Sequence, residues 1–583
     1  MTAPRTHSPT RNPGDVRARL GQELLRRGHL SQDRLEEIEH RAAWLEEPLD
    51  QLATREHLAT PEELTAILSE ITGIPVLPMA DVRIDRELAG RIDPHLVARY
   101  HLMPIRMEGG VILLATDRIR QEEEEDHLRV LLGAPPRWTL CTPRELEECI
   151  KHVYGVGLET FVQMAQTGSR RKPSAPGDET ETEANPNLSD FLLQVIRDAI
   201  RAGATDIHFE PEEERLRLRY RVDGVLHSVP LPVGIDRIRK AVLSSVKVMA
   251  QLNIAERRLP QDGRFSIDVD GRTCDLRVSV LPSRHGESVA LRILNRDATF
   301  LQLDQLGLHP DLLTDLRDLL AQPHGMILFT GPTGSGKTTS LYASLAHLND
   351  EQRKIVTLED PIEYQIAGIV QMQVEPQIGF TFASGLRSIL RHDPDVVLIG
   401  EIRDDETAGI AVSAALTGHL VFSTLHTNDS TAAANRLLDM GIEPYLAASS
   451  IDGIVAQRLV RCICPRCREP ILDERIVADL RATGPELAAT PVFYRGRGCP
   501  HCRFTGYSGR RAIFEILIVT DELRTLISER APGNRMLDCA RHLGLRTLRE
   551  SGFQCVTEGL TTVEEVLRVT HRTRERNILK PGT

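Results

Sequence analysis

Gly331–Thr338 reads GPTGSGKT and directly follows the apolar run Met326–Thr330. The stretch fits the pattern GxxxxGK[ST], in which glycines allow a tight turn between a strand and a helix. A stretch without helix breakers, from Thr338 to Leu348, comes next and predicts that helix. Backbone N–H groups at such a helix N-terminus converge on phosphate oxygens. The sequence therefore predicts a nucleotide-binding α/β domain.

Individual residues of this loop have separate tasks. Lys337 is expected to reach the β- and γ-phosphates, and the Thr338 hydroxyl can bind Mg²⁺. A glycine turn formed by chance is the alternative, but the flanking strand and helix patterns both favour the motif. The residues expected to contact the nucleotide are Gly331, Pro332, Thr333, Gly334, Ser335, Gly336, Lys337, Thr338 and Thr339.

Length and composition limit the class of protein. A chain of 583 residues is too long for one core and predicts about four domains of roughly 150 residues each. The formal net charge is −12, and aromatic residues make up 4% of the chain. Both values disfavour nucleic acid as a partner, because unspecific binding needs positive charge and single strands stack on aromatic rings.

Neither a secretory signal nor a membrane span is expected. The first nine residues contain charge and proline, with no apolar run behind them. The stretch closest to a span, Ala408 to Leu425, contains Thr417-Gly418-His419 and predicts a buried helix followed by a strand. We therefore expect a cytoplasmic protein that associates with a membrane only through partners.

The chain divides into further segments by composition and periodicity. Leucine and isoleucine recur at helical spacing near the N-terminus, and two hairpin signals, Asp223-Gly224 and Asp270-Gly271, mark an α+β region. The expected segments are disordered residues 1–15, a helical docking module 16–75, a small α/β module 76–165, a linker 166–187, an α+β middle domain 188–299, the nucleotide-binding core 300–460, a cysteine element 461–506 and a helical C-terminal domain 507–583.

Two further apolar runs of the core end in acidic residues. Ile355–Leu358 leads into Glu359-Asp360-Pro361-Ile362-Glu363, and Val396–Gly400 leads into Glu401. Nucleotide chemistry in open α/β sheets takes place at the carboxyl ends of the strands. Glu401 therefore fits a carboxylate that holds Mg²⁺ directly or through water. For both acids the alternative is an ordinary solvated strand end.

Four of the ten cysteines form two CxxC pairs, and these are Cys464, Cys467, Cys499 and Cys502. Two such pairs supply four thiolates to one tetrahedral zinc ion. In a cytoplasmic chain this pattern favours a metal over disulfides. Free or redox-active thiols remain an alternative, and Cys462 and His501 are alternative ligands.

Three longer motifs carry a resemblance to a known family: Ala204–Pro211 (ATDIHFEP), Arg221–Leu226 (RVDGVL) and Ala255–Arg264 (AERRLPQDGR). They resemble the signatures of the type II secretion and type IV pilus assembly ATPases, in the family's order, and the resemblance extends over residues 187–565. It implies a RecA-like/AAA+ core, a PAS-like middle domain, a four-cysteine zinc element, and ATP with Mg²⁺ as cofactors. It also implies a homo-hexamer docked through its N-terminal part on an inner-membrane platform.

The resemblance assigns further roles in the nucleotide site. Glu363 matches the carboxylate that polarises the attacking water, while its division of labour with Glu401 stays open. Arg264 and Arg277 match family arginines that complete the site from the middle domain. The alternative for these arginines is pairing with acids in their own hairpin.

Two histidines match the histidine box of the same family. His419 and His426 bracket the apolar run Leu420–Leu425. The resemblance implies that they sense the γ-phosphate or the subunit contact. From spacing alone a structural role is as well supported, because a lone histidine is more often structural than catalytic.

The N-terminal region resembles paired repeats of the form RLGxxLLxxGxL, which bind cyclic di-GMP in some secretion and pilus ATPases. The first copy fits at Arg19-Leu20-Gly21, Leu24-Leu25, Gly28 and Leu30. The second has Pro48-Leu49-Asp50 in place of Arg-Leu-Gly. We therefore expect a helical docking module that does not bind this ligand tightly.

The sequence supports an ATPase that drives pseudopilus assembly in type II secretion, by this resemblance. A type IV pilus assembly ATPase is the alternative within the family. A nucleic-acid translocase shares the phosphate loop but should show a basic stripe or an aromatic ladder, and neither is evident. A scaffold that binds nucleotide without hydrolysis is disfavoured because Lys337, Glu363 and Glu401 are all present.

Overall fold

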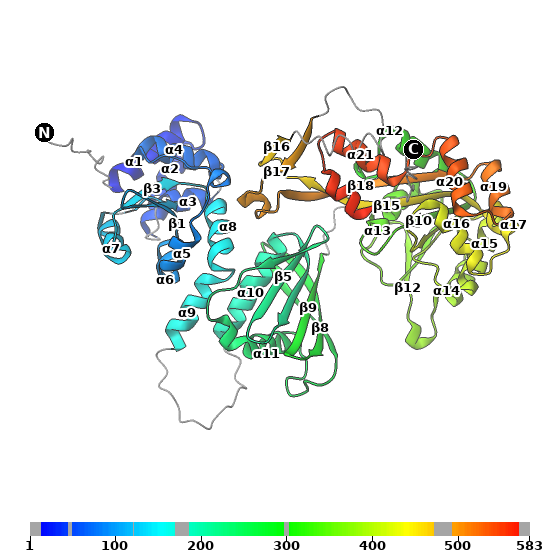
Figure 1. Ribbon diagram of the computed structural model, residues 1–583, viewed down its shortest axis with the longest axis horizontal. Helices are drawn as coiled ribbons and strands as arrows, with labels where there is room; N and C mark the ends of the chain where they lie inside the picture. Colours follow the sequence, from blue (N-terminus) through cyan, green and yellow to red (C-terminus); the bar gives the residue numbers. More distant parts are fainter. Residues whose placement is uncertain are drawn as a thin grey trace, which may run out of the picture. The chain divides into compact units, whose positions relative to one another are not determined.

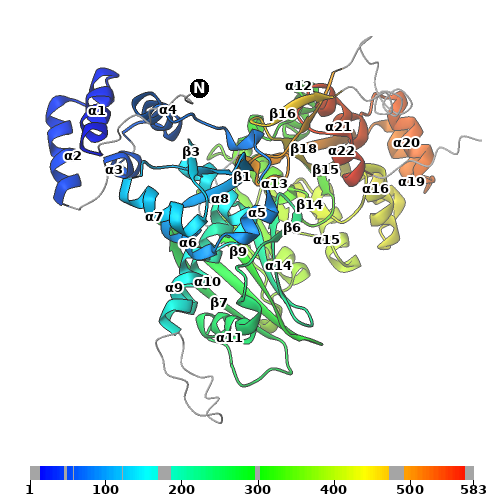
Figure 2. The same ribbon diagram turned by 60° about the vertical axis from the view of Figure 1, so that its left-hand side comes forward.

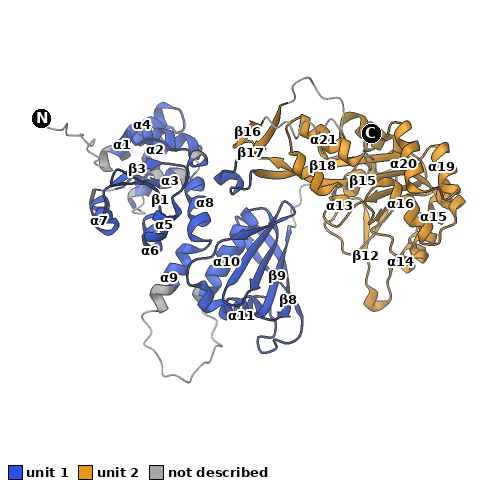
Figure 3. Cartoon of the chain, in the orientation of Figure 1, with its two compact units in different colours: residues 1–295, 497–506 blue, residues 296–496, 507–583 orange. Residues whose placement is uncertain are grey.

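The computed structural model describes residues 13–44, 49–56, 58–120, 122–168, 186–295, 302–471 and 492–570. The chain forms two compact units (Figure 3). The first comprises residues 1–295 and 497–506, and the second comprises residues 296–496 and 507–583. The first twelve residues, most of the expected linker and the end of the chain lie outside the described residues, so the predictions of disorder there are not tested.

The first unit begins with a helical region and a small α/β region, as expected. Leucines at helical spacing, such as Leu20, Leu24 and Leu52, are buried in one core with the strands that follow. The elements are α1 (Pro13–Arg26), α2 (Gln32–Trp44), α3 (Leu49–Arg55), α4 (Pro61–Thr72), η1 (Met79–Asp81), α5 (Arg86–Arg91), α6 (Pro94–Tyr100), β1 (Leu102–Glu108), β2 (Val111–Thr116), α7 (Glu122–Leu132), β3 (Pro136–Leu140), α8 (Pro143–Tyr154) and α9 (Leu158–Gly168).

The middle domain is a six-stranded antiparallel sheet in the order β6-β5-β4-β9-β8-β7. Helices α10 and α11 pack against each other and against this sheet (Figure 2). The elements are α10 (Pro186–Arg201), β4 (Ala204–Pro211), β5 (Leu216–Val222), β6 (Val225–Val229), η2 (Ile235–Ile238), α11 (Arg239–Met249), β7 (Gln261–Val269), β8 (Arg272–Ser283) and β9 (Gly286–Asn295).

Both hairpin predictions in this domain are confirmed. Asp223 and Gly224 connect β5 to β6 with φ angles of 49° and 80°, and Asp270 and Gly271 connect β7 to β8 with 52° and 78°. Two positive φ angles are what a type I′ turn requires, and Asp-Gly adopts them readily. The local sequence therefore fixes the register of both hairpins.

The second unit is built on a seven-stranded sheet in the order β12-β11-β13-β14-β10-β15-β18. Figure 1 labels β12, β10, β15 and β18 of this sheet. All neighbouring strands are parallel except β15 and β18. The first elements are η3 (Leu303–Gln305), α12 (Pro310–Leu320), β10 (Gly325–Thr330), α13 (Lys337–Leu348), β11 (Ile355–Glu359), β12 (Val370–Gln373), η4 (Pro376–Ile378), α14 (Phe382–Ile389), β13 (Val396–Ile399), α15 (Asp405–Leu416) and β14 (Leu420–Leu425).

The remaining elements complete this sheet and cover it. They are α16 (Ser430–Asp439), α17 (Pro444–Ser450), β15 (Ile451–Ile463), β16 (Arg468–Ile471), β17 (Phe493–Gly496), η5 (Pro500–Cys502), β18 (Tyr507–Ile518), α19 (Asp521–Ser528), α20 (Gly533–His542), α21 (Leu548–Thr557) and α22 (Val563–Val569). Of these, η5 belongs to the first unit.

Helices cover both faces of the seven-stranded sheet. Met326 and Leu328 of β10 pack into a core with α14, α15, α16 and α17, whereas Ile327 and Phe329 pack with α12 and α13. Successive residues of a strand point to opposite faces, so a strand buried on both faces is apolar throughout. This explains why Met326–Thr330 shows no polar alternation.

Residues 507–518 correct one prediction. They form β18, an antiparallel partner of β15, where the sequence analysis placed the start of a helical domain. The helices begin only at Asp521. A short apolar run cannot be assigned to strand or helix from periodicity alone. Here the segment is a strand because it pairs with β15.

The limits of two other predicted segments also differ. Helix α1 begins at Pro13, α9 ends at Gly168 and α10 begins at Pro186, so residues 13–15, 166–168 and 186–187 are helical where the sequence predicted disorder or a linker. The Ala408–Leu425 stretch is a helix followed by a strand, as predicted. No helix among the described residues is long and apolar enough to cross a membrane.

Candidate nucleotide site

The predicted site residues gather at one edge of the seven-stranded sheet. Strands β10, β14, β13 and β11 are parallel neighbours, so their carboxyl ends lie at the same edge. The phosphate loop follows β10, and Glu401 follows β13. Strand β14 lies between these two and leads into His426. This edge is the position at which open α/β sheets bind ligands.

The phosphate loop has the backbone conformation that its glycines allow. Gly334 and Gly336 have φ angles of 79° and 89°, and helix α13 begins directly afterwards at Lys337. The Lys337 ammonium donates to the carbonyl oxygens of Gly331 at 2.6 Å and of Pro332 at 3.2 Å. The side chain is therefore held across the loop, where phosphate oxygens bind in this motif. The predicted strand, loop and helix are all present.

The Lys337 ammonium lies in a weakly solvated position. Its pKa is lowered to about 8, mainly because the group is buried and secondly because the Arg458 guanidinium is close, while Glu401 opposes the shift. An ammonium held in a weakly solvated position beside the phosphate loop fits an anionic ligand. The residues present thus fit the phosphates of a nucleoside triphosphate.

Glu401 lies at the end of β13 and is mostly buried, with 12% of its side chain exposed. It forms an ion pair with Arg403, and its Oε2 atom lies 3.5 Å from His426 Nε2. The Thr424 hydroxyl of β14 donates to the Gly400 carbonyl at 2.7 Å and fixes the strand end. Glu401 and the exposed Thr338 carry side-chain oxygen atoms, the ligand type that Mg²⁺ prefers, and so fit the predicted magnesium site.

The segment from Glu359, the last residue of β11, to Glu363 contains three acids in different environments. Glu359 is buried, accepts hydrogen bonds from the Tyr342 and Thr357 hydroxyls, and also accepts one from Gln371 at 3.2 Å. Burial and the Glu359 carboxylate raise the pKa of Tyr342. Glu363, in contrast, is exposed. Glu359 therefore connects β11 to α13 and β12, whereas Asp360 and Glu363 are exposed and accessible to a ligand.

The two predicted histidines lie at opposite ends of β14. His426 follows the strand and contacts Glu401, whereas His419 precedes it. The Nδ1 atom of His419 lies 3.0 Å from the Ala414 carbonyl at the end of α15. The structure therefore brings His426, but not His419, to the edge that holds the phosphate loop.

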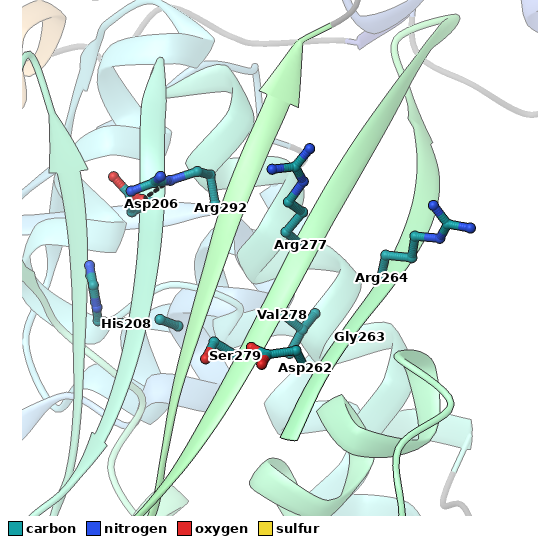
Figure 4. A pocket seen from close by; sticks show the side chains of 10 residues that line it. Asp206, His208, Asp262, Gly263, Arg264, Arg277, Val278, Ser279 and Arg292 are labelled. Atoms are coloured by element: carbon teal, nitrogen blue, oxygen red, sulfur yellow. Dashed lines mark hydrogen bonds and ion pairs between the residues drawn. The ribbon is translucent and has the colours of Figure 1, made fainter. Parts of the chain in front are cut away.

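Arg264 and Arg277 lie directly opposite each other on β7 and β8 (Figure 4). The same line across the sheet continues to Arg292 on β9, whose Nε donates to Asp206 at 2.9 Å. These four residues help to line a cavity of about 680 Å³ in the middle domain. The three guanidinium groups outnumber the two carboxylates of the lining, those of Asp206 and Asp262, so the surface fits an anion. Neither Asp262 nor Asp275 forms an ion pair with Arg264 or Arg277 among the described residues.

The four predicted zinc ligands are brought together. The sulfur atoms of Cys464, Cys467, Cys499 and Cys502 are buried and lie within 4.8 Å of one another. Those of Cys499 and Cys502 are 3.7 Å apart, close to the roughly 3.8 Å expected for two sulfurs at tetrahedral vertices 2.3 Å from zinc. Backbone N–H groups of Cys499 and Gly506 donate to Cys502 Sγ at 3.2 and 3.3 Å. The set fits zinc, and the alternatives Cys462 and His501 lie outside this cluster.

Comparison with known proteins identifies the family. A model described as "Type II/IV secretion system protein" matches residues 181–568. The chain belongs to this family. A second model, the MshEN domain, matches residues 72–160. Membership in the type II/IV secretion system family, together with the strand order, confirms the expected RecA-like core and α+β middle domain.

Individual members of the type II/IV secretion system family match over much of the chain. "Type II secretion system protein E" of Pseudomonas aeruginosa is 50% identical over 393 residues, which cover 67% of this chain and 77% of the relative. The protein of the same name from Xanthomonas campestris pv. campestris is 44% identical and covers 81% and 83%. "Type IV pilus assembly ATPase PilB" of Myxococcus xanthus is 38% identical and covers 87% and 90%.

Sequence reasoning about this secretion-family chain missed two residues next to the phosphate loop. Gln457 and Arg458 belong to β15 and are both buried. The sequence did contain a signal for them. Two adjacent polar residues interrupt the apolar run Ile454–Val460, and polar side chains buried in a strand need hydrogen-bond partners. Their partners come from segments distant in sequence, and only the fold could supply them.

Proposed function

We propose that the chain hydrolyses ATP with Mg²⁺ and thereby drives pseudopilus assembly in a type II secretion system. The observation that carries the hydrolysis proposal is the arrangement at one sheet edge of Lys337, Thr338 and Glu401. Identity of 44–50% to proteins named type II secretion system protein E supports the secretion role. The geometry of the site thus supports ATP hydrolysis, and the relatives support a role in type II secretion.

In this proposal each group at the sheet edge has one task. The backbone N–H groups of the phosphate loop and the Lys337 ammonium hold the β- and γ-phosphates. Thr338 and Glu401 would hold Mg²⁺, which when bound neutralises charge on the transferring phosphoryl group. Glu363 is proposed to orient the attacking water, and His426 to report on the state of Glu401 through their contact.

Arg264 and Arg277 are proposed to complete the reaction by stabilising the negative charge of the transferring phosphoryl group. Their guanidinium groups form no ion pair with a described residue, and the row that they form with Arg292 carries net positive charge. Positive charge placed at the transferring group is a recurrent device in phosphoryl transfer. His419 has no comparable support, and we propose a structural role for it.

The assembly and location follow from family membership as further proposals. We propose a homo-hexamer in the cytoplasm, peripheral to the inner membrane, that docks on membrane-platform proteins. Type IV pilus assembly remains the second candidate, because the relative named PilB matches a larger share of the chain, although at a lower identity of 38%. We also propose that one zinc ion is held by the four clustered cysteines.

The proposed function is tested in the source bacterium after deletion of the gene. Complementation with the intact chain should restore export of secreted enzymes, and the Lys337→Ala chain should not. Pilus-dependent surface motility is measured in the same strains. Restored export with unchanged motility supports secretion, whereas restored motility with unchanged export would replace it by pilus assembly. Phosphate release by the purified chain tests hydrolysis separately.

A further inference from the structure

Gln457 and Arg458 lie beside the phosphate loop on the strand next to β10. Thr330, the last residue of β10, is paired with Ala456 of β15, so Gln457 follows alongside Gly331. A Cβ atom at Gly331 would lie 2.7 Å from the Gln457 carbonyl and 2.9 Å from Arg458 Nη1. One at Gly336 would lie 2.8 Å from the Gln457 amide. The loop and this strand segment are therefore in direct contact.

The Arg458 guanidinium connects two segments of backbone. Its Nη1 donates to the Gln457 carbonyl at 2.9 Å, and its Nη2 donates to the Asn428 carbonyl at 2.7 Å. Asn428 belongs to the connection between β14 and α16. Arg458 thus holds residues 426–429 against β15, the strand beside the phosphate loop, by a hydrogen bond.

Residues 426–429 are themselves connected to both halves of the nucleotide site. The Thr427 backbone N–H donates to Thr330 Oγ1 at 3.0 Å, and the two threonine hydroxyls are 2.6 Å apart. His426 contacts Glu401. A continuous set of contacts therefore runs from Arg458 through this connection to the carboxylate at the end of β13.

Burying the charged Arg458 side chain at this position costs free energy. It is 5% exposed, burial lowers its pKa, and the acids that act on it electrostatically, Glu515 and Asp429, form no ion pair with it among the described residues. Lys337 adds a like charge nearby. A buried guanidinium whose hydrogen bonds go only to carbonyls contributes little to stability. This burial of charge favours a functional role.

Two further buried groups at this contact have no hydrogen-bond partner among the described residues. They are the Gln457 Oε1 and Ser335 Oγ atoms, and both side chains are more than nine-tenths buried. Buried polar groups of purely structural contacts are nearly always paired. Exceptions call for an explanation such as strain, a catalytic role or a bound water or ion, and these two groups lie at the phosphate loop.

We propose that Arg458 is a positioning residue that couples the phosphate loop to Glu401 through residues 426–429 of the same chain. It does not touch the nucleotide in this proposal. It keeps His426, and with it Glu401, at the distance from the phosphate loop that hydrolysis needs. The proposal rests on the ATP hydrolysis proposed above, and it concerns the turnover step and not the binding of ATP.

The test compares Arg458→Gln, Arg458→Lys and the matched control Arg524→Gln in the full-length chain. Arg524 also donates to a backbone carbonyl, that of Ala448, and to Asp452, and it lies on α19 away from the phosphate loop. We expect Arg458→Gln to lower kcat by about tenfold or more while the ATP dissociation constant changes less than about threefold. Arg458→Lys should retain intermediate activity, and Arg524→Gln should keep the kcat of the unmodified chain.

A double-variant measurement separates positioning from a general loss of structure. If Arg458 acts through His426, then Arg458→Gln should lower kcat by less than about twofold in a chain that already carries His426→Ala. Independent, multiplying effects would overturn the proposal, as would an unchanged kcat in Arg458→Gln or a loss confined to ATP affinity. If the unmodified chain itself releases no phosphate, the hydrolysis proposal fails first, and the two failures are thereby distinguished.

Discussion

His426 Nε2 lies 3.5 Å from Glu401 Oε2, although the two residues follow different strands and are 25 positions apart. The contact is possible because β13 and β14 are parallel neighbours whose carboxyl ends meet at one edge. In the proposal above this carboxylate holds Mg²⁺, and a histidine in contact with it is positioned to respond to the charge there. Through this contact Glu401 is linked to residues 426–429, which Arg458 holds against β15.

The first prediction concerns the arginine row of the middle domain. Arg264→Ala should lower kcat by ~100-fold or more with ATP binding retained, because arginines that stabilise the transferring phosphoryl group contribute roughly 10³–10⁵ in rate in other nucleotide hydrolases. The matched control is Arg272→Ala, which removes an exposed arginine from the same hairpin. Equal rates for the Arg264 and Arg272 variants would exclude Arg264 from the reaction.

The second prediction is one zinc ion per chain. Protein purified without added metal should contain close to one equivalent by elemental analysis, and Cys499→Ser should lose it, because three thiolates leave the tetrahedral site incomplete. Cys539→Ser removes a cysteine outside the cluster and should keep the metal. Less than about half an equivalent in the unmodified chain would favour free thiols.

The third prediction concerns cyclic di-GMP. We expect weak or no binding to the full-length chain, because only the first N-terminal repeat keeps its Arg-Leu-Gly. In that repeat Gly21 lies in α1 and packs on Leu35, whose Cδ1 would be 2.9 Å from a Cβ at this position. Titration calorimetry decides the matter. A dissociation constant near or below ~1 μM would show that the second repeat also binds.

The fourth prediction is a pH-dependent contribution of Glu565 to stability. Burial alone would raise its pKa, but hydrogen bonds from Arg461 and Arg568 outweigh this and lower the pKa to about 2 from a reference value of 4.5. The stabilisation is therefore present above pH 4.5 and is lost as the pH falls toward 2. Glu565→Gln should lower the unfolding temperature at pH 7, and the difference from the unmodified chain should shrink below pH 4.

Glu564→Gln is the control for that measurement, because Glu564 is exposed on the same helix. It should leave the unfolding temperature nearly unchanged at every pH. A difference between the Glu565 variant and the unmodified chain that stays constant from pH 7 to pH 3 would contradict the assigned pKa.

Much of the nucleotide site could be predicted because its signals are local. The phosphate loop, its strand and its helix are consecutive, and Glu401 lies two residues beyond the end of β13, so the ends of these strands can be predicted from the sequence. The hairpins at Asp223-Gly224 and Asp270-Gly271 were predictable for the same reason. Local turn chemistry and strand patterns need no knowledge of the fold.

Other features depend on contacts between distant segments. Arg458 meets Asn428 only because β15 lies beside β10 in the sheet, and no spacing in the sequence indicates this. The strand β18 was expected to be helical until its pairing with β15 was known. The row from Arg264 to Arg292 likewise requires the order of three strands.

The central claim, hydrolysis of ATP at the phosphate loop with Glu401, is tested most directly by phosphate release from purified full-length protein. MgATP binding is measured in parallel on the same samples. Lys337→Ala should lose binding or turnover, because the loop then lacks its cation for the β- and γ-phosphates. Glu401→Gln should still bind MgATP, but its rate of phosphate release should fall by ~100-fold or more. Undiminished phosphate release by both variants would contradict the account.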